Sequence, residues 1–168
     1  ASVTFISNYA FLGCSSLTSI TIPASVTTIG SQPFRDCSNL TSIIIPASVT
    51  TIVSSAFQNS GLTSATVSVD KLLTFGVSVG TNQSFFGKAG VTIVGYKVFS
   101  GANELTGATA QLNGATQAII EGYTSIGISA FQNAKTLTSI TIPASVTTIG
   151  LNAFRDCSNL TSVIIPAS

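Results

Sequence analysis

Residues 17–39 read L-T-S-I-T-I-P-A-S-V-T-T-I-G-S-Q-P-F-R-D-C-S-N, and residues 40–61 repeat them closely as L-T-S-I-I-I-P-A-S-V-T-T-I-V-S-S-A-F-Q-N-S-G. Residues 137–159 return to the first stretch with three changes. Self-similarity at a period of about 20–50 residues is the signature of repeat architectures, in which each repeat is one structural unit of a stack. These three stretches therefore predict a chain built from stacked coils of similar shape.

Leucines mark the phase of the repeat along the rest of the chain. They are Leu17, Leu40, Leu62, Leu105, Leu137 and Leu160. An apolar residue and a Phe precede each of them, in the pairs Ile6/Phe11, Ile29/Phe34, Ile52/Phe57, Val94/Phe99, Ile126/Phe131 and Ile149/Phe154. Three of the five intervals between the leucines are 22 or 23 residues. This pattern predicts six coils in phase.

The side chains within one coil divide into a strand and a back. Leu17, Ile20 and Ile22 begin the coil, and the last two alternate as inward-facing residues of a strand do. Pro23 ends the strand because it has no N–H to donate to a ladder. Val26, Ile29 and Phe34 then fill the back of the coil. Because one such coil buries too little apolar surface to fold alone, only a stack of coils is stable.

Two intervals are longer than the repeat. Leu62 to Leu105 holds about 20 extra residues, and Leu105 to Leu137 holds about nine, if the spacing within each coil is held fixed. The sequence therefore predicts a single solenoid domain over residues 1–168, of about six coils, with insertions at about 67–91 and 107–116.

The motif L-T-S-I-x-I-P-x-S-V-T-x-I-G-x-x-A-F-x-x-C-x-x-L closely resembles the BspA-like leucine-rich repeats. The resemblance covers residues 1–66, 92–106 and 117–168. It implies a β-rich solenoid: a right-handed leucine-rich-repeat coil with a parallel concave sheet and short turns or helical pieces on the convex side. It also implies an extracellular or cell-surface location and adhesion to other surfaces. The family shares no catalytic residues, so the resemblance implies no active site.

Composition excludes several function classes. The net charge is +1, charged residues make up 7% of the chain, and histidine is absent. Such a balance attracts neither nucleic acid nor anionic lipid. Apolar runs such as Ile43–Ile45 are far shorter than the roughly 20 residues that span a bilayer, so no membrane insertion is expected. Without histidine, no usual base activates the many Ser and Thr hydroxyls. We expect no enzyme activity and no cofactor.

The three cysteines occupy equivalent positions, each three residues before a marker leucine. They are Cys14, Cys37 and Cys157. Alanine takes the same position in other coils, which indicates a small buried group, so free buried thiols are favoured over a disulfide. A straight ladder of cysteines without histidine does not enclose a metal such as zinc.

Two surfaces compete as the binding site. The first is the outer face of the strands, which is neutral and mildly apolar. Its predicted residues are Ser19, Thr21, Ser42, Ile44, Ser64, Thr66, Thr109, Ser139, Thr141, Ser162 and Ile164. The second belongs to the long insertion, whose predicted site residues are Phe75, Phe85, Phe86, Lys88 and Tyr96. Loops on a rigid scaffold often carry recognition, but Phe85 and Phe86 could equally roof the widened coil.

Three N-glycosylation sequons occur, at Asn39, Asn82 and Asn159. Asn39 and Asn159 precede strands at a turn, and Asn82 lies in the long insertion. We expect all three to be exposed and glycosylated if the chain is secreted by a eukaryote.

Three functions fit these features. The first is an extracellular binding or adhesion module whose partner is a protein or glycan surface. The second is a structural subunit of a filament or coat, built by head-to-tail stacking of copies. Residues 17–48 match residues 137–168 at 28 of 32 positions, which fits either a longer tandem period of 120 residues or a local duplication within one solenoid. The third is an ice-binding solenoid, suggested by ranks of threonine on a sheet.

Overall fold

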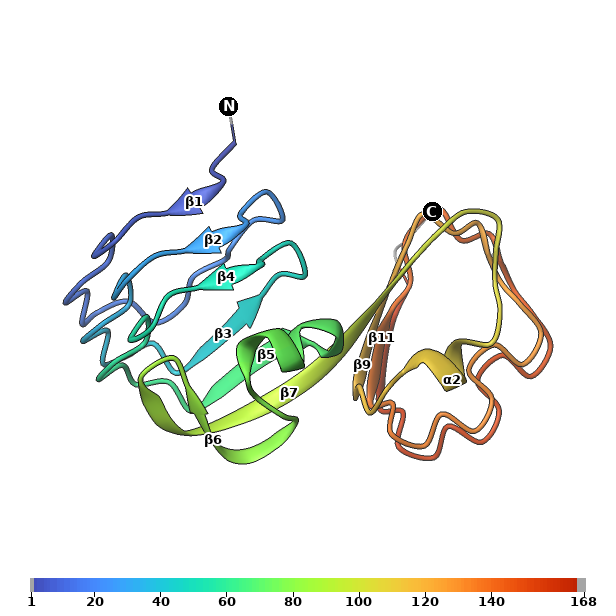
Figure 1. Ribbon diagram of the computed structural model, residues 1–168. Coiled ribbons are helices and arrows are strands. Elements are labelled where there is room, and N and C mark those ends of the chain that lie inside the picture. Colours follow the sequence, from blue (N-terminus) through green and yellow to red (C-terminus); the bar gives the residue numbers. More distant parts are fainter. Residues whose placement is uncertain (1, 166–168) are drawn as a thin grey trace. The chain divides into compact units, whose positions relative to one another are not determined.

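The structure is a computed structural model that describes residues 2–165, and it divides into two compact units that meet between Val94 and Gly95. Figure 1 shows parallel strands repeated along the chain in both units. Each unit is a parallel-strand β-solenoid with little helix, which confirms the predicted fold class. The single domain expected from the sequence stays a prediction. Each unit is described by itself below.

Unit 1, which ends at Val94, contains two parallel ladders. In the first, β1 (Phe5–Ile6), β2 (Thr28–Ile29) and β4 (Thr51–Ile52) pair in that order. In the second, β3 (Ser42–Ile45) pairs with β5 (Ser64–Ser68), and Ser42 lies opposite Ser64. Residues one repeat apart in the sequence are therefore neighbours across the ladders, as the repeat predicts.

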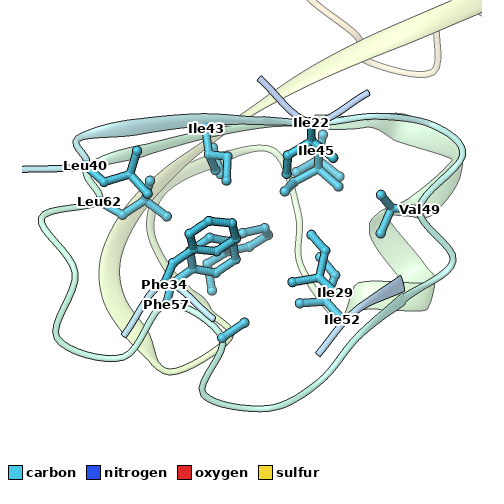
Figure 2. Close-up of a cluster of buried hydrophobic side chains, with 14 of the residues drawn as sticks. Ile22, Ile29, Phe34, Leu40, Ile43, Ile45, Val49, Ile52, Phe57 and Leu62 are labelled. Carbon is cyan, nitrogen blue, oxygen red and sulfur yellow. The ribbon is translucent and has the colours of Figure 1, made fainter. Parts of the chain in front are cut away.

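The core of unit 1 lies inside the coils. Ile29, Phe34 and Leu40 have no exposed surface, and Figure 2 shows them beside their equivalents one coil further on. The rings of Phe11, Phe34 and Phe57 stack in sequence with centroids 5.4 and 5.3 Å apart. The predicted alignment of the Phe residues and the burial of Leu40 are confirmed.

The long predicted insertion completes the core of unit 1. It contains η1 (Val69–Lys71), α1 (Leu72–Phe75), and a hairpin of β6 (Gly80–Phe85) with the start of β7 (Lys88–Ser100). Phe85 stacks on Phe57 at 5.4 Å and forms the fourth ring of the row. The Phe57 N–H donates to the Phe86 carbonyl at 3.0 Å, as a coil-to-coil bond would. This segment therefore covers the last regular coil of unit 1.

Unit 2, which begins at Gly95, also contains two parallel ladders. The first joins β8 (Glu104–Leu105), β10 (Ser125–Ile126) and β12 (Thr148–Ile149). The second joins the end of β7, β9 (Gln117–Glu121), β11 (Ser139–Thr141) and β13 (Ser162–Ile164). Phe131 and Phe154 stack at 5.2 Å, and Phe99 meets Phe131 edge-on at 5.5 Å.

The predicted phase is wrong at the start of unit 2. Leu105 pairs with Ile126 in the ladder of β8 and β10, so it takes the position of Ile29 in the coil and not that of a marker leucine. Phe99 lies in β7 opposite Ile120, so it does not take the Phe position either. The reason is that the interior positions of a coil accept any apolar side chain of suitable size, so Leu105 fits the position of an Ile.

Residues 107–116 are correspondingly not an insertion. The Thr116 N–H donates to the Gly95 carbonyl at 3.0 Å, and the Thr138 N–H donates to the Thr116 carbonyl at 2.7 Å. These bonds place Val94, Ala115 and Leu137 at equivalent positions. The short helix α2 (Ala108–Gln111) replaces the Phe-containing turn, and Ala108 and Leu112 are buried. The segment therefore completes an ordinary coil.

β7 carries two registers. In unit 1 the Thr92 N–H donates to the Thr63 carbonyl at 2.8 Å, and in unit 2 Gly95 holds the corresponding position opposite Thr116. The two positions are three residues apart on one strand. The repeat of unit 1 and the repeat of unit 2 are therefore out of phase with each other.

Hydroxyl groups link each coil to the one before it. The Thr50 Oγ1 donates to the Thr27 carbonyl at 3.2 Å, and the Ser48 Oγ donates to the Val26 carbonyl at 2.8 Å. In unit 2 Ser145 and Thr147 make the same bonds, to Tyr123 and Thr124. The letters A-S-V-T of the repeat therefore satisfy backbone carbonyls along the stack.

Between residues 2 and 165, no helix has the length and apolar character needed to cross a membrane.

Candidate functional site

The outer face of the unit 1 sheet is built by strand alternation. In β3, Ile43 and Ile45 point into the core, whereas Ser42 and Ile44 are exposed. The side chain of Ile44 is 63% exposed. Ser64 and Thr66 lie opposite them in β5 and are half-buried. These four positions form two rows of uncharged side chains.

Ser19 and Thr21, which were predicted to extend these rows, are exposed. Within residues 2–165, however, the stretch from Leu17 to Ile22 forms no strand. They belong to the coil before β3, and the structure does not show them as part of the paired sheet.

The outer face of unit 2 is similar but includes residues that the sequence analysis missed. Ser139 and Thr141 lie opposite Ser162 and Ile164, and Ile164 is 57% exposed. The next residues in these rows are Gln117 and Ile119 of β9. The signal for them was present, since A-T-Q-A-I-I at 115–120 has the spacing of L-T-S-I-T-I, but the misplaced phase hid it.

Thr109 does not belong to this face, so the prediction for it is wrong. It lies in α2, and its hydroxyl donates to the Gln132 carbonyl at 2.9 Å. Because the coil phase was set on Leu105, Thr109 was counted as a strand residue. The structure gives it a turn-stabilising bond to the following coil.

The aromatic residues predicted as an insertion-loop site lie mostly in the core. Phe85 has no exposed surface. Phe86 is half-buried and meets Phe75 and Phe85 edge-on, at 5.6 and 5.0 Å. Lys88 is also half-buried. These contacts match the alternative in which Phe85 and Phe86 roof the widened coil.

Tyr96, the fifth residue of that predicted site, lies in unit 2 and is 3% exposed. Leu73 of α1 is the most exposed large apolar residue of this segment, at 97%. The sequence analysis did not select it. Leu73 sits at the second position of a four-residue helix, where no periodic pattern could have indicated its direction.

Two ion pairs join charged residues that are neighbours in the sequence. Arg35 Nε lies 3.3 Å from Asp36 Oδ2, and Arg155 and Asp156 repeat this pair at 3.3 Å. Partly exposed pairs of this kind contribute little to stability. In the part of the chain that the structure describes, no cluster of three or more His, Cys, Asp or Glu residues is placed to hold a metal ion.

The cysteines are free thiols with different surroundings. The Sγ of Cys37 donates to the Phe11 carbonyl at 3.1 Å, and that of Cys157 donates to the Phe131 carbonyl at 3.0 Å. Burial raises the pKa of the Cys37 thiol, and nearby Cys14 raises it further; burial also raises the pKa of Cys157. Cys14 is exposed, so the prediction that all three are buried is wrong. Of its equivalents, Cys37 is buried and Cys157 is half-buried, and both lie against the preceding coil.

Unit 1 also contains an apolar cavity of about 280 Å³. Its lining residues include Phe5, Ile6, Phe11, Ile20, Ile22 and Val26. No titratable side chain lines it, so it offers shape and apolar surface but no acid–base chemistry.

Asn39, Asn82 and Asn159 are all exposed, as the sequence analysis predicts. Asn82 lies in β6, next to irregular pairing between β6 and β7, with a left-handed backbone (φ 55°). Asn is one of the residues that tolerates this conformation.

A protein-family model matches the repeat. The model of the BspA type leucine rich repeat region matches six copies, over residues 4–111 and 110–168. No curated protein matches the chain. Among solved structures, a leucine-rich repeat protein from Bacteroides ovatus is 22% identical over 98% of this chain, with a TM-score of 0.34. This chain spans 35% of the length of that protein. The parallel coils, the stacked Phe rows and the match over nearly every residue lead to one assignment: the chain belongs to the BspA type leucine rich repeat family.

Proposed function

We propose that this chain is a non-catalytic binding or adhesion module of the cell surface or extracellular space, and that it binds through the outer faces of its parallel strands. The observation that carries the proposal is the exposed aliphatic side chain within rows of small hydroxyl residues. Ile44 stands in unit 1 and Ile164 in unit 2, both more than half exposed. The partner we propose is a protein or glycan surface, with no nucleic acid and no insertion into a membrane.

Three features support this face over other surfaces. The rows are uncharged, so an extended partner meets no desolvation penalty for buried charge. The ladders hold the backbone rigid, so little conformational entropy is lost when a partner binds. Family membership supports a repeat-based binding module, and it supports a surface or extracellular location.

The proposal is tested by placing a charge on the face. The chain is screened against a panel of immobilised matrix proteins and polysaccharides, and the strongest binder is kept as the probe. Ile44→Lys is expected to weaken binding at least tenfold, because a lysine within the proposed contact face must be desolvated without a partner.

The matched control is Leu73→Lys, which places the same charge on a more exposed leucine away from the sheet. It is expected to leave binding unchanged. Equal losses from the two variants, or no loss from Ile44→Lys, would contradict binding through the sheet face.

A second candidate is a structural subunit of a filament or coat. The near-identity of residues 17–48 and 137–168 favours it, because coils of one sequence fit one another's faces interchangeably. Electron microscopy of the native material distinguishes the two, since a structural subunit gives filaments or sheets and a binding module gives separate particles.

A further inference from the structure

Two of the sequons are the same tripeptide at the same point of the coil. Asn39-Leu40-Thr41 and Asn159-Leu160-Thr161 both lie in the turn before a strand, and both asparagines are exposed. The repeat itself explains the threonine, because its equivalents bond the preceding coil: the Thr63 hydroxyl donates to the Thr41 carbonyl at 3.1 Å. This bond does not explain why asparagine occurs two residues before the threonine.

At Asn159 the asparagine side chain has a structural role. Its Nδ2 donates to the Lys135 carbonyl at 2.7 Å, and the Thr161 hydroxyl donates to the Thr138 carbonyl at 3.2 Å. Both side chains of this sequon therefore stabilise the stack. A sugar on this nitrogen would compete with the bond to Lys135.

At Asn39 the structure shows no comparable role for the side chain. Within residues 2–165, neither the Asn39 amide nor the Thr41 hydroxyl donates a hydrogen bond to the protein. Other coils place Ser16, Gly61 and Thr136 at this position, so the turn itself does not need an amide. Ser16, Gly61 and Thr136 share only small size.

We propose that Asn39 is an N-glycosylation site, which rests on the proposed extracellular location. In the reaction, a bond forms between Asn39 Nδ2 and the anomeric carbon of an oligosaccharide. The bond from that carbon to the oxygen of its lipid pyrophosphate donor breaks, the amide loses one proton, and the lipid pyrophosphate leaves. No group is oxidised or reduced. The sugar extends into solvent beside the start of β3, whose Ser42 and Ile44 belong to the proposed binding face.

The primary test is mass spectrometry of the protein recovered from the cells that make it. The peptide that contains Asn39 is expected to carry an oligosaccharide that a peptide-N-glycosidase removes, converting Asn39 to Asp. A bare Asn39 overturns the proposal, and if that bare protein comes from outside the cell, the proposed function stands without it.

Variants of the chain secreted from cultured eukaryotic cells identify the attachment site. Asn39→Gln and Thr41→Ala are each expected to lose one oligosaccharide, whereas Thr41→Ser is expected to keep it because serine also supplies the hydroxyl. The control Ser38→Ala changes an exposed neighbour outside the sequon and is expected to keep it. Retention in Thr41→Ala would overturn the assignment.

A stability measurement on unglycosylated protein separates this role from a structural one. Asn39→Ala is expected to leave the Tm unchanged, whereas Asn159→Ala is expected to lower it by a few degrees through loss of the bond to Lys135. A Tm loss from Asn39→Ala equal to that from Asn159→Ala would show that Asn39 is retained for the fold, and would overturn the argument for a sugar.

Discussion

Small residues in this chain set the distance between coils. A Cβ on Gly61 would overlap the carbonyl oxygen of Ser38 in the preceding coil, and a Cβ on Gly30 would lie 2.9 Å from the Ile6 carbonyl oxygen. Backbone carbonyls therefore occupy the space that a side chain would need. In these two coils the close approach of the preceding backbone leaves no room for an added Cβ, although other coils carry larger residues at the same positions, such as Val53 at the position of Gly30.

Gly61→Ala is expected to destabilise the chain by about 2–4 kcal/mol, because the clash is with backbone that cannot rotate away. Urea denaturation measures the free energy of unfolding. The control is Gly13→Asn, since Gly13 has open space and a left-handed backbone that Asn59 adopts at the equivalent position. It is expected to change stability by less than about 0.5 kcal/mol; a large loss there together with none at Gly61 would contradict the packing argument.

The thiols are expected to react with iodoacetamide in the order of their exposure, with Cys14 first and Cys37 last. Burial raises the pKa of Cys37, so its thiolate forms only at higher pH than that of an ordinary thiol. The folded state therefore holds this proton more tightly than the unfolded state does. Its contribution to stability is present below the unfolded pKa and is lost as pH rises through the folded pKa. Peptide mapping after timed alkylation at several pH values checks the order, and equal rates would refute it.

At the scale of elements, the hairpin of β6 and β7 replaces a coil in sealing the core of unit 1. Phe85 joins the row of Phe rings, and the Phe86 carbonyl accepts the bond that the next coil would accept. A Cβ on Gly87 would lie 2.8 Å from the Ser55 Cα, so the hairpin packs closely against the coil below. The hairpin differs from the repeat in sequence, but it makes the ring stacking and the backbone hydrogen bond that a regular coil would make.

Phe85→Ala is expected to cost about 3–5 kcal/mol, because it opens a cavity at the end of the ring row. Chemical denaturation followed by the fluorescence of Tyr residues or by circular dichroism measures the loss. Leu73→Ala, in the same segment but almost fully exposed, is the control and is expected to cost less than about 0.5 kcal/mol. Similar costs for both would mean that the hairpin does not seal the core.

The sequence predicted the elements correctly where the repeat is strong. It misplaced them where the structure of a segment depends on the strands and coils packed beside it. Phe34, Phe57 and Leu40 were placed correctly because ring stacking and burial follow from in-phase coils. Leu105 was misplaced because an apolar side chain fits either interior position. The six letters L-T-S-I-T-I occur twice and form different structures. At residues 137–142 they contain β11, which lies between β9 and β13, whereas at residues 17–22 they form no strand in the described chain. A strand needs a paired neighbour, which its own letters do not specify.

The candidate site was predicted in the same uneven way. Ser42, Ile44, Ser139, Thr141 and Ile164 lie on outer faces as strand alternation requires. Thr109 was misassigned, and Gln117 and Ile119 were missed, because Leu105 was taken as a marker leucine although it takes the position of Ile29 in the coil. The aromatic side chains of the long segment were wrongly predicted to form an exposed binding site. The burial of Phe85 depends on a stack formed by residues distant in the sequence, which the segment's own sequence does not indicate.

At the scale of the whole molecule, the chain holds two cores, and their independence can be measured. Phe57→Ala removes the third ring of the unit 1 row. We expect hydrogen exchange to accelerate at the amides of Ile29 and Ile52, and to stay slow at those of Ile126 and Ile142, because stability in repeat proteins depends on adjacent coils. Uniform acceleration in both units would instead support the single domain predicted from the sequence.

The rows of the outer faces also bear on ice binding. Ile44 interrupts the threonines of unit 1, and Ile119 and Ile164 interrupt those of unit 2. An ice-binding surface needs regular spacing of like groups, so the chain is expected to show no thermal hysteresis. A measurable freezing-point depression at micromolar protein would contradict this expectation and revive the third function.

β7 aligns with unit 1 through Thr92 and with unit 2 through Gly95, three residues later. Each unit therefore sets its own register on β7, and adding a whole coil to one unit leaves the register of the other unchanged. We therefore expect gene rearrangements that add or remove coils on one side of this strand to leave the other array folded. Recombination between related genes within the codons of β7 would then exchange whole arrays, and the diversity of such proteins would concentrate in how arrays are combined.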